Sequence, residues 1–295
     1  MKKTVFSGVA TAIITPLCDK GIDYDKFKQL TEWQIAEGVD AIVVCGTTGE
    51  SATLSDQEHR DAIKFMVDTV KGRIPVIAGT GSNDTAYACY LTEYDCSVGV
   101  DGLLVVTPYY NKATQKGLIR TFTEIADHST KPVILYNVPS RTGVNILPST
   151  CDVLAEHPNI TAVKEASGNI SQVAEIAALC KGRLDIYSGN DDQVVPIMAL
   201  GGKGVISVVS NLLPKRTAEM CRLFREGKIA ESAEIQLELL PLINALFCEV
   251  NPIPVKAAMA AMGFCEDYLR LPLTPMEEGN REKLLSLMRA HNLNV

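Results

Sequence analysis

The sequence contains no long apolar run. None of its segments reaches the about 18 consecutive apolar residues that a membrane-spanning helix needs, so we expect no membrane partner. A cluster of basic residues is also missing, and the formal net charge is -7 at pH 7. Because nucleic acid is polyanionic, this charge balance argues against a nucleic-acid partner.

Paired cysteines and clustered histidines are missing as well. The nine cysteines are scattered without a CxxC pair, and Cys45, Cys180 and Cys248 lie inside apolar runs. We interpret the cysteines as buried free thiols of a protein in the reducing cytoplasm. The four histidines lie far apart in the sequence, so we expect no metal site. The amino terminus resembles a signal peptide only faintly, because Ser7 and Gly8 interrupt its apolar run.

The first two thirds of the sequence do contain eight short apolar runs. Most of these runs are continuous rather than alternating, which is typical of strands buried on both faces. We therefore predict eight buried strands. The runs cover residues 8–16, 40–46, 75–81, 101–110, 132–139, 160–166, 184–191 and 204–211.

Helical periodicity fills the segments between these runs. Residues 25–38 and 56–72 are examples, and Ser55 with Glu58 forms a capping box at the start of the second. A chain of 295 residues suits a single (β/α)8 barrel, which typically holds about 250 residues. We predict an α/β fold, a (β/α)8 TIM barrel. A doubly wound open sheet is the alternative, but a count of eight strands favours the closed barrel.

After residue 211 the strand pattern stops and only helical patterns continue. We predict that the first of these helices completes the barrel and that the others form a small C-terminal helical domain. The predicted domains are therefore a catalytic barrel over 1–227 and a helical domain over 228–295. The helical segments cover residues 215–227, 228–249, 253–263 and 275–291.

Polar sequences follow several of the predicted strands. In barrels of this class, residues at the carboxyl ends of the strands form the active site, so we expect these sequences to meet. The sequences are CGTTGES (45–51), TPYYN (107–111), YNVPSRTG (136–143), KEASG (164–168) and SGND (188–191).

Lys164 is an unusual residue for a buried strand. With a period of two, Ala162, Lys164 and Ala166 share one face, and Tyr136 on the preceding strand can point inward beside them. A lysine removed from water loses proton affinity relative to its ordinary pKa of about 10.4, and a neutral amine can form a Schiff base with a ketone. A nearby tyrosine could move the protons that this reaction requires. A lysine held in the barrel core by an ion pair, for example to a glutamate, is an equally good interpretation.

Two further sequences suit the binding of anions. The glycines and hydroxyls of GTTGES could hold a carboxylate or phosphate, although a tight strand-to-helix turn explains the sequence equally well. The segment lacks the lysine of a P-loop. Arg141 could bind a carboxylate in a bidentate manner, or it could be a solvated arginine of a loop.

Four of these sequences together resemble a known family. GTTGES, YNVPSRTG, the lysine of VKEASG and SGND are similar, in order and spacing, to the pyruvate-dependent Schiff-base aldolases that include N-acetylneuraminate lyase. Within that family the resemblance is greatest to the dihydrodipicolinate synthases, and it extends over essentially the whole chain. It implies a (β/α)8 barrel with a helical C-terminal domain, assembled as a homotetramer that is a dimer of dimers.

The resemblance also implies a reaction. It is a lyase reaction that condenses pyruvate with L-aspartate 4-semialdehyde through a lysine Schiff base, on the route to lysine and diaminopimelate. The product is 4-hydroxy-tetrahydrodipicolinate. No cofactor is implied, because pyruvate is itself the covalently bound substrate.

The catalytic residues implied by the resemblance come from four strand ends. Lys164 is the nucleophile that binds pyruvate, and Tyr136 donates and accepts protons. Thr47 and Tyr110 complete the proton relay, with Tyr110 reaching in from the neighbouring subunit.

The substrate-binding residues implied by the resemblance are four others. Thr48 and the backbone of Ile206 contact the carboxylate of pyruvate, and Gly189 lines the site. Arg141 receives the carboxylate of the semialdehyde. Sugar-acid lyases of the family do not carry arginine at this position.

Two other functions could also use a barrel with Lys164 in it. A sugar-acid or sialic-acid aldolase would also use Lys164, but Arg141 argues against it. A non-catalytic barrel that binds keto acids would need Lys164 only as a structural cation, and it would not need Tyr136, Thr47 and Tyr110 together.

Feedback-inhibited relatives bind lysine at a dimer interface. Some residues of this chain fit that site, but Asp56 stands where such relatives often have histidine and Tyr87 where they have glutamate. The loss of a carboxylate that could pair with an ammonium group predicts weak or absent inhibition by lysine. The residues that fit the possible effector site are Ser51, Ala52, His59, Asn83 and Tyr109.

Overall fold

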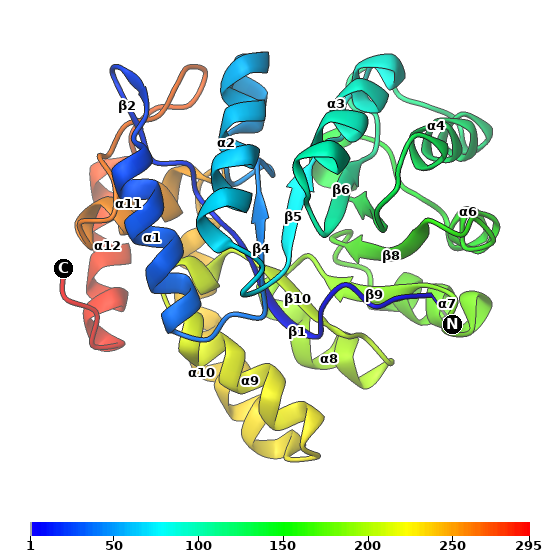
Figure 1. The fold of residues 1–295 in the computed structure, drawn as a ribbon. Coiled ribbons are helices and arrows are strands. Elements are labelled where there is room, and N and C mark those ends of the chain that lie inside the picture. Colours follow the sequence, from blue (N-terminus) through cyan, green and yellow to red (C-terminus); the bar gives the residue numbers. More distant parts are fainter. Residues whose placement is uncertain (1) are drawn as a thin grey trace.

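The computed structural model describes residues 2–295, and eight parallel strands close into a barrel at its centre (Figure 1). Around the barrel the strands follow the order β1-β10-β9-β8-β7-β6-β5-β4. Each barrel strand therefore pairs with the barrel strands that precede and follow it in the chain, and β1 pairs with β10 to close the ring. They are β1 (Gly8–Ala12), β4 (Ala41–Val44), β5 (Val76–Gly79), β6 (Gly102–Val106), β7 (Val133–Asn137), β8 (Ile160–Glu165), β9 (Asp185–Ser188) and β10 (Gly204–Ser207).

A helix follows each barrel strand and covers its outer face (Figure 1). Each of the eight predicted runs contains one strand, so the prediction of a (β/α)8 barrel is confirmed and the open-sheet alternative is wrong. The covering helices are α1 (Tyr24–Ala36), α2 (Asp56–Val70), α3 (Thr85–Val98), α4 (Gln115–Asp127), α6 (Pro148–Leu154), α7 (Ile170–Cys180), α8 (Val194–Ala199) and α9 (Pro214–Arg225).

The strands separate two apolar clusters, which explains their continuous apolar sequences. Inward-facing side chains such as Ala162 and Ile134 fill the barrel, whereas outward-facing ones such as Val163 and Leu135 pack under the helices. Because side chains alternate between the two faces, a strand buried on both needs apolar residues at nearly every position. Lys164 is a buried charged-type residue among these inward-facing apolar side chains.

Three helices follow the barrel: α10 (Ile229–Leu246), α11 (Ile253–Ala261) and α12 (Glu278–Ala290). They confirm the helical segments predicted there. Helix α10 packs against α8 and α9 as well as α12, so the segment after 227 is continuous with the barrel's outer layer. A short antiparallel hairpin, β2 (Leu17–Cys18) with β3 (Gly21–Ile22), was not predicted.

Local contacts join this C-terminal segment to the barrel. The predicted capping box at α2 is confirmed, since Ser55 and Glu58 bond reciprocally. Arg270 donates two hydrogen bonds to the Glu58 carboxylate and lowers its pKa to about 2. On α1, Trp33 packs against Phe264, with ring centroids 4.6 Å apart.

The nine cysteines are all free, as predicted, and six of them are buried. The expectation of burial is wrong for Cys248, which is exposed, and for Cys18 and Cys96, which are half-buried. The apolar run around Cys248 belongs to α10, but the helix ends at Leu246, so Cys248 lies in the turn beyond the packed face.

Asp95 on α3 is a carboxyl group buried without a partner. Its side chain is 0% exposed, and neither oxygen has a hydrogen-bond partner within residues 2–295. Burial raises its pKa to about 8. The folded chain therefore keeps this proton up to about pH 8, whereas the unfolded chain releases it near pH 4. Between these values the contribution of Asp95 to stability falls as the pH rises.

We predict that Asp95→Asn removes this pH dependence. The free energy of unfolding of the variant should exceed that of the unaltered protein by an amount that grows by about 1.4 kcal/mol per pH unit between about pH 5 and pH 8. Urea unfolding across this range measures the difference, and Asp68→Asn, at an exposed carboxylate, is the control. Parallel pH profiles for Asp95→Asn and the unaltered protein would contradict the prediction.

Candidate active site

A small cavity of ≈ 170 Å³ lies at the carboxyl ends of the barrel strands. It gathers residues from the ends of β4, β7, β8 and β9, as the barrel rule predicts. Six of the eight residues expected to take part in catalysis or substrate binding line it. They are Thr47, Thr48, Tyr136, Arg141, Lys164 and Gly189.

Lys164 lies in this cavity beside Tyr136. The two residues are opposite each other in the register of β7 and β8, and the Lys164 Nζ is 4.2 Å from the centroid of the Tyr136 ring. Lys164 is 6% exposed, with Ala162 and Ala166 leaving space on either side of it. The predicted inward orientation of both side chains is confirmed.

The ion-pair interpretation of Lys164 is wrong. Within residues 2–295, no carboxylate lies within 4.0 Å of its amine. The adjacent Glu165 points to the other face of β8, where its carboxylate accepts hydrogen bonds from Asn137 and Gln172. A buried amine without an ion partner is costly to stability, so the arrangement suits chemistry rather than packing.

The GTTGES turn contributes Thr47 and Thr48 to the lining of the cavity. The backbone N–H groups of Thr47 and Thr48 find no acceptor in the described chain. Glu50 of this turn forms an ion pair with Lys256 on α11, in which the carboxylate lies 2.8 Å from the amine. This ion pair fixes the position of the turn. The sequence therefore forms the expected tight turn, and its role in binding an anion stays a prediction.

Gly189 packs so closely against Ala166 and Lys164 that a side chain at position 189 would collide with Ala166 and crowd Lys164. A Cβ atom at position 189 would lie 2.6 Å from the Cβ of Ala166 and 3.1 Å from the Cε of Lys164. Glycine therefore leaves the lysine side chain room to move. Ile206, in contrast, is buried inside the barrel beneath the cavity and does not line it, although Val208 of the same segment does.

Asp191 lies behind this part of the cavity. It is 2% exposed and accepts hydrogen bonds from the backbone N–H groups of Val208 and Val209, each 2.9 Å long. Burial raises the pKa of Asp191, and these hydrogen bonds and the charge of Lys164 oppose the rise. Asp191 thus fixes the segment that follows Ile206.

Arg141 lies in a short helix, α5 (Pro139–Thr142), rather than in a loop. Its Nη2 donates a hydrogen bond of 3.0 Å to the backbone carbonyl of Asn251. One end of the guanidinium is thereby anchored, and the remaining N–H groups are available to a carboxylate in the cavity.

Tyr110 lies outside the cavity. It has a positive φ of 71°, and its side chain is 90% exposed, while the neighbouring Tyr109 is 37% exposed. Within this chain, Tyr110 is therefore not brought to Lys164.

A second cavity of ≈ 450 Å³ adjoins the first and shares four lining residues with it: Thr47, Val138, Arg141 and Asn251. Four residues of the possible effector site line it: Ser51, Ala52, His59 and Tyr109. Asn83 does not, but its carbonyl accepts a hydrogen bond from Asn111 nearby. Burial lowers the pKa of His59, whose ring donates to the carbonyl of Gly79.

Two residues of the C-terminal segment, which were not predicted as site residues, also line the first cavity. Phe247 and Asn251 follow α10 and come from the C-terminal segment. Their approach depends on how α10 and α11 fold back over the barrel, and the strand-end rule could not find them. Pro252 and Pro254 mark the break between α10 and α11, but they do not indicate that this break reaches the cavity.

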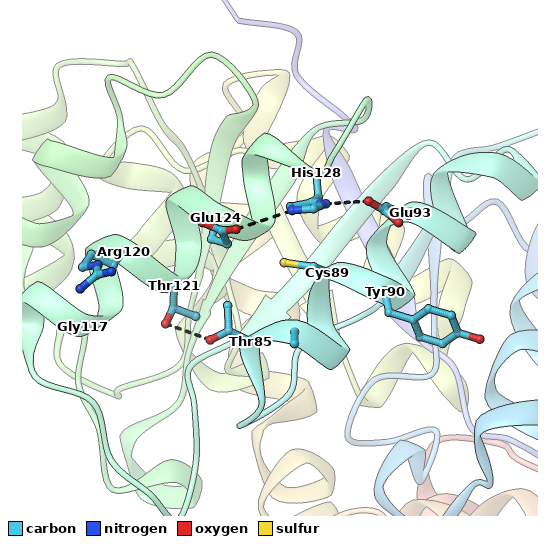
Figure 2. Close-up of a pocket in the computed structure, with 10 residues that line it drawn as sticks. Thr85, Cys89, Tyr90, Glu93, Gly117, Arg120, Thr121, Glu124 and His128 are labelled. Atoms are coloured by element: carbon cyan, nitrogen blue, oxygen red, sulfur yellow. Dashed lines mark hydrogen bonds and ion pairs between the residues drawn. The ribbon is translucent and has the colours of Figure 1, made fainter.

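The outer ring of helices holds a larger pocket of ≈ 710 Å³ between α3 and α4 (Figure 2). There His128 bonds Glu93 and lies near Glu124, and the bond to Glu93 raises the pKa of His128. We assign the active site to the smaller cavity, because the pocket of Figure 2 contains none of the polar residues that end the strands.

In the part of the chain that the structure describes, no three His, Cys, Asp or Glu residues group as a metal site. No helix over residues 2–295 combines the length and apolar character required to cross a bilayer.

A (β/α)8 barrel whose strand-end cavity holds a buried, unpaired lysine beside a tyrosine is suited to covalent catalysis at a lysine amine. The chain belongs to the dihydrodipicolinate synthetase family, whose model matches residues 5–291. This confirms the family expected from the sequence.

Individual relatives are similar along their whole length. The 4-hydroxy-tetrahydrodipicolinate synthase of Clostridium tetani is 52% identical, over 98% of this chain and 99% of its own. The enzyme of that name from a Thermoanaerobacter species is 55% identical, over 98% of both chains. The crystal structure of dihydrodipicolinate synthase from Aquifex aeolicus superposes with a TM-score of 0.97 at 45% identity, covering 98% of this chain and 99% of that one.

Proposed function

We propose that the chain is a lyase that condenses pyruvate with L-aspartate 4-semialdehyde to give 4-hydroxy-tetrahydrodipicolinate, in lysine and diaminopimelate biosynthesis. The observation that carries this proposal is the buried amine of Lys164, which lies beside Tyr136 and has no carboxylate partner among residues 2–295. The full-length similarity to enzymes named for this product supports it. The reaction needs no cofactor, and free thiols at all nine cysteines suit the cytoplasm.

In this reaction Lys164 attacks the ketone carbon of pyruvate as a neutral amine. Loss of water gives an imine, which acts as an electron sink when a proton leaves the methyl carbon. The resulting enamine carbon bonds to the aldehyde carbon of the semialdehyde, whose oxygen takes up a proton. The amine of the second substrate then displaces Lys164 and closes the ring. Tyr136, in contact with the amine, transfers protons in these steps, and Thr47 connects it to the relay.

The two carboxylates bind at opposite sides of the cavity in this proposal. The Thr48 hydroxyl and the backbone near Ile206 hold the carboxylate of pyruvate, and Gly189 leaves room beside the imine. The anchored guanidinium of Arg141 receives the carboxylate of the semialdehyde.

A substrate comparison tests the proposal. Purified protein should consume pyruvate and aspartate semialdehyde together, and it should show no cleavage of sialic acid or 2-keto-3-deoxy sugar acids. Efficient cleavage of a sugar acid, with no turnover of the semialdehyde, would assign the chain to the sugar-acid aldolases of the family instead.

We propose that the chain comprises two domains, a barrel over 1–227 and a helical domain over 228–295. We also propose that it forms a homotetramer, a dimer of dimers, in which Tyr110 completes the active site of the neighbouring subunit. The exposure of Tyr110 supports an intersubunit role.

We predict that co-expressed Lys164→Met and Tyr110→Phe chains, each inactive alone, form mixed dimers that regain activity. Only a site with Lys164 from one chain and Tyr110 from the other is complete. Mixed dimers without activity, or a fully active monomer, would contradict this arrangement.

We predict weak or absent inhibition by lysine, because the carboxylates around the second cavity already have partners. Glu50 pairs with Lys256, and Asp56 pairs with Arg60 at 2.8 Å and accepts a hydrogen bond from Tyr87. Burial, with this hydrogen bond, raises the pKa of Tyr87 to about 12, so it cannot supply the missing negative charge. Initial rates measured with added lysine test this, with norleucine as the control that lacks only the side-chain ammonium group. Submillimolar inhibition specific to lysine would contradict it.

A further inference from the structure

We infer that Asn251, a residue of the C-terminal segment, positions Thr48 to bind the carboxylate of pyruvate. This inference rests on the proposed function. Asn251 lies between α10 and α11, is 5% exposed, and lines the cavity that contains Lys164. Its side chain contacts one substrate-binding residue and its backbone contacts another.

The side-chain contact sets the direction of a hydroxyl group. The Asn251 Nδ2 donates a hydrogen bond of 3.0 Å to the Thr48 Oγ1. A threonine hydroxyl has one hydrogen to donate, so an oxygen that accepts from an amide turns its own hydrogen elsewhere. No other hydrogen bond of the Thr48 hydroxyl occurs within residues 2–295, and Thr48 lines the cavity. The hydroxyl is thus prepared to donate to an anion there.

The backbone contact serves the other substrate. Arg141 donates to the carbonyl of Asn251, and this bond does not depend on the side chain at position 251. Substitutions of Asn251 should therefore act on the pyruvate side of the cavity and leave the side of the semialdehyde largely intact.

A second contact keeps Asn251 in place relative to the GTTGES turn. One turn further along the chain, the amine of Lys256 bonds both Glu50 and the carbonyl of Thr15, at 2.8 Å each. The turn that carries Thr48 is thus held by the C-terminal segment at two points, one of which reaches the cavity.

Kinetics of Asn251→Asp and Asn251→Ala test the inference. A carboxylate at position 251 can only accept, so it captures the Thr48 hydroxyl hydrogen and repels the carboxylate of pyruvate. We expect Asn251→Asp to raise the KM for pyruvate by at least about tenfold, while the KM for the semialdehyde stays within about twofold. Asn251→Ala should have a smaller effect in the same direction. The exposed Asn244→Ala, on α10, is the matched control.

A double-mutant cycle separates positioning from a general structural role. If Asn251 acts through Thr48, Asn251→Ala should add little to the pyruvate KM of Thr48→Val. Additive losses, an unchanged pyruvate KM in Asn251→Asp, or an equal rise in both KM values would overturn the inference. Failure of the unaltered protein to form a pyruvate adduct would instead overturn the proposed function, so the two outcomes are distinguishable.

Discussion

Lys164→Met abolishes both adduct formation with pyruvate and condensation activity, and it does not destabilise the protein. Methionine fills nearly the same volume, so the packing between Ala162 and Ala166 is kept. Because Lys164 is buried with no carboxylate partner in the described residues, replacing its amine breaks no ion pair and leaves no buried carboxylate unpaired. We expect activity to fall by a factor on the order of 10^4 or more, as for other catalytic nucleophiles, with an unchanged or raised Tm.

Activity and Tm, measured together, distinguish a nucleophilic Lys164 from a structural one. A structural cation would give a lower Tm in the variant, whereas a nucleophile gives lost activity at an unchanged or higher Tm. Lys203→Met, at a half-exposed lysine outside the cavity, is the control for loss of a positive charge. Residual condensation above one hundredth of the original rate would contradict the role of Lys164 as the only nucleophile.

We expect Lys256→Met to lower the free energy of unfolding strongly, although Lys256 lies in the C-terminal segment. Its amine and the carboxylate of Glu50 are both almost completely buried, at 0% and 1% exposure. Removing the lysine leaves a buried carboxylate without its partner, which typically costs about 3–5 kcal/mol. The free energy of unfolding from urea titrations measures the loss. The GTTGES turn should loosen with it, so the KM for pyruvate should rise as well.

A paired variant isolates the role of this ion pair. Glu50→Gln combined with Lys256→Met removes both charges and should regain part of the lost stability. Lys64→Met, which breaks an exposed pair with Asp68, should change stability little, because water screens that pair. A loss in Lys256→Met no greater than in Lys64→Met would show that the buried pair is not important to the fold.

Much of this fold could be predicted from the sequence, because strands buried on both faces have a strong local signature. Each of the eight apolar runs contains a barrel strand, and the period of two placed Lys164 and Tyr136 inside the barrel. Once the barrel was predicted, the rule for strand ends brought together Thr47, Arg141 and Gly189 without further information.

The features that could not be predicted depend on long-range packing. Asn251 reaches the cavity only because α10 and α11 fold back over the barrel, and no local sequence pattern predicts this approach. Asp95 is a polar residue in an ordinary helical pattern, and only the packing around α3 buries it. Cys248 was misjudged for the opposite reason: its neighbours are apolar, but α10 ends before it.

The proposed reaction begins with a Schiff base between Lys164 and pyruvate. Intact-mass spectrometry after incubation with pyruvate and borohydride tests it most directly, since reduction makes an imine permanent. We predict a mass gain of one reduced pyruvate per chain, located by peptide mapping at Lys164 and absent from Lys164→Met. A correctly folded protein that gains no mass, or that carries the adduct at another lysine, would contradict the account.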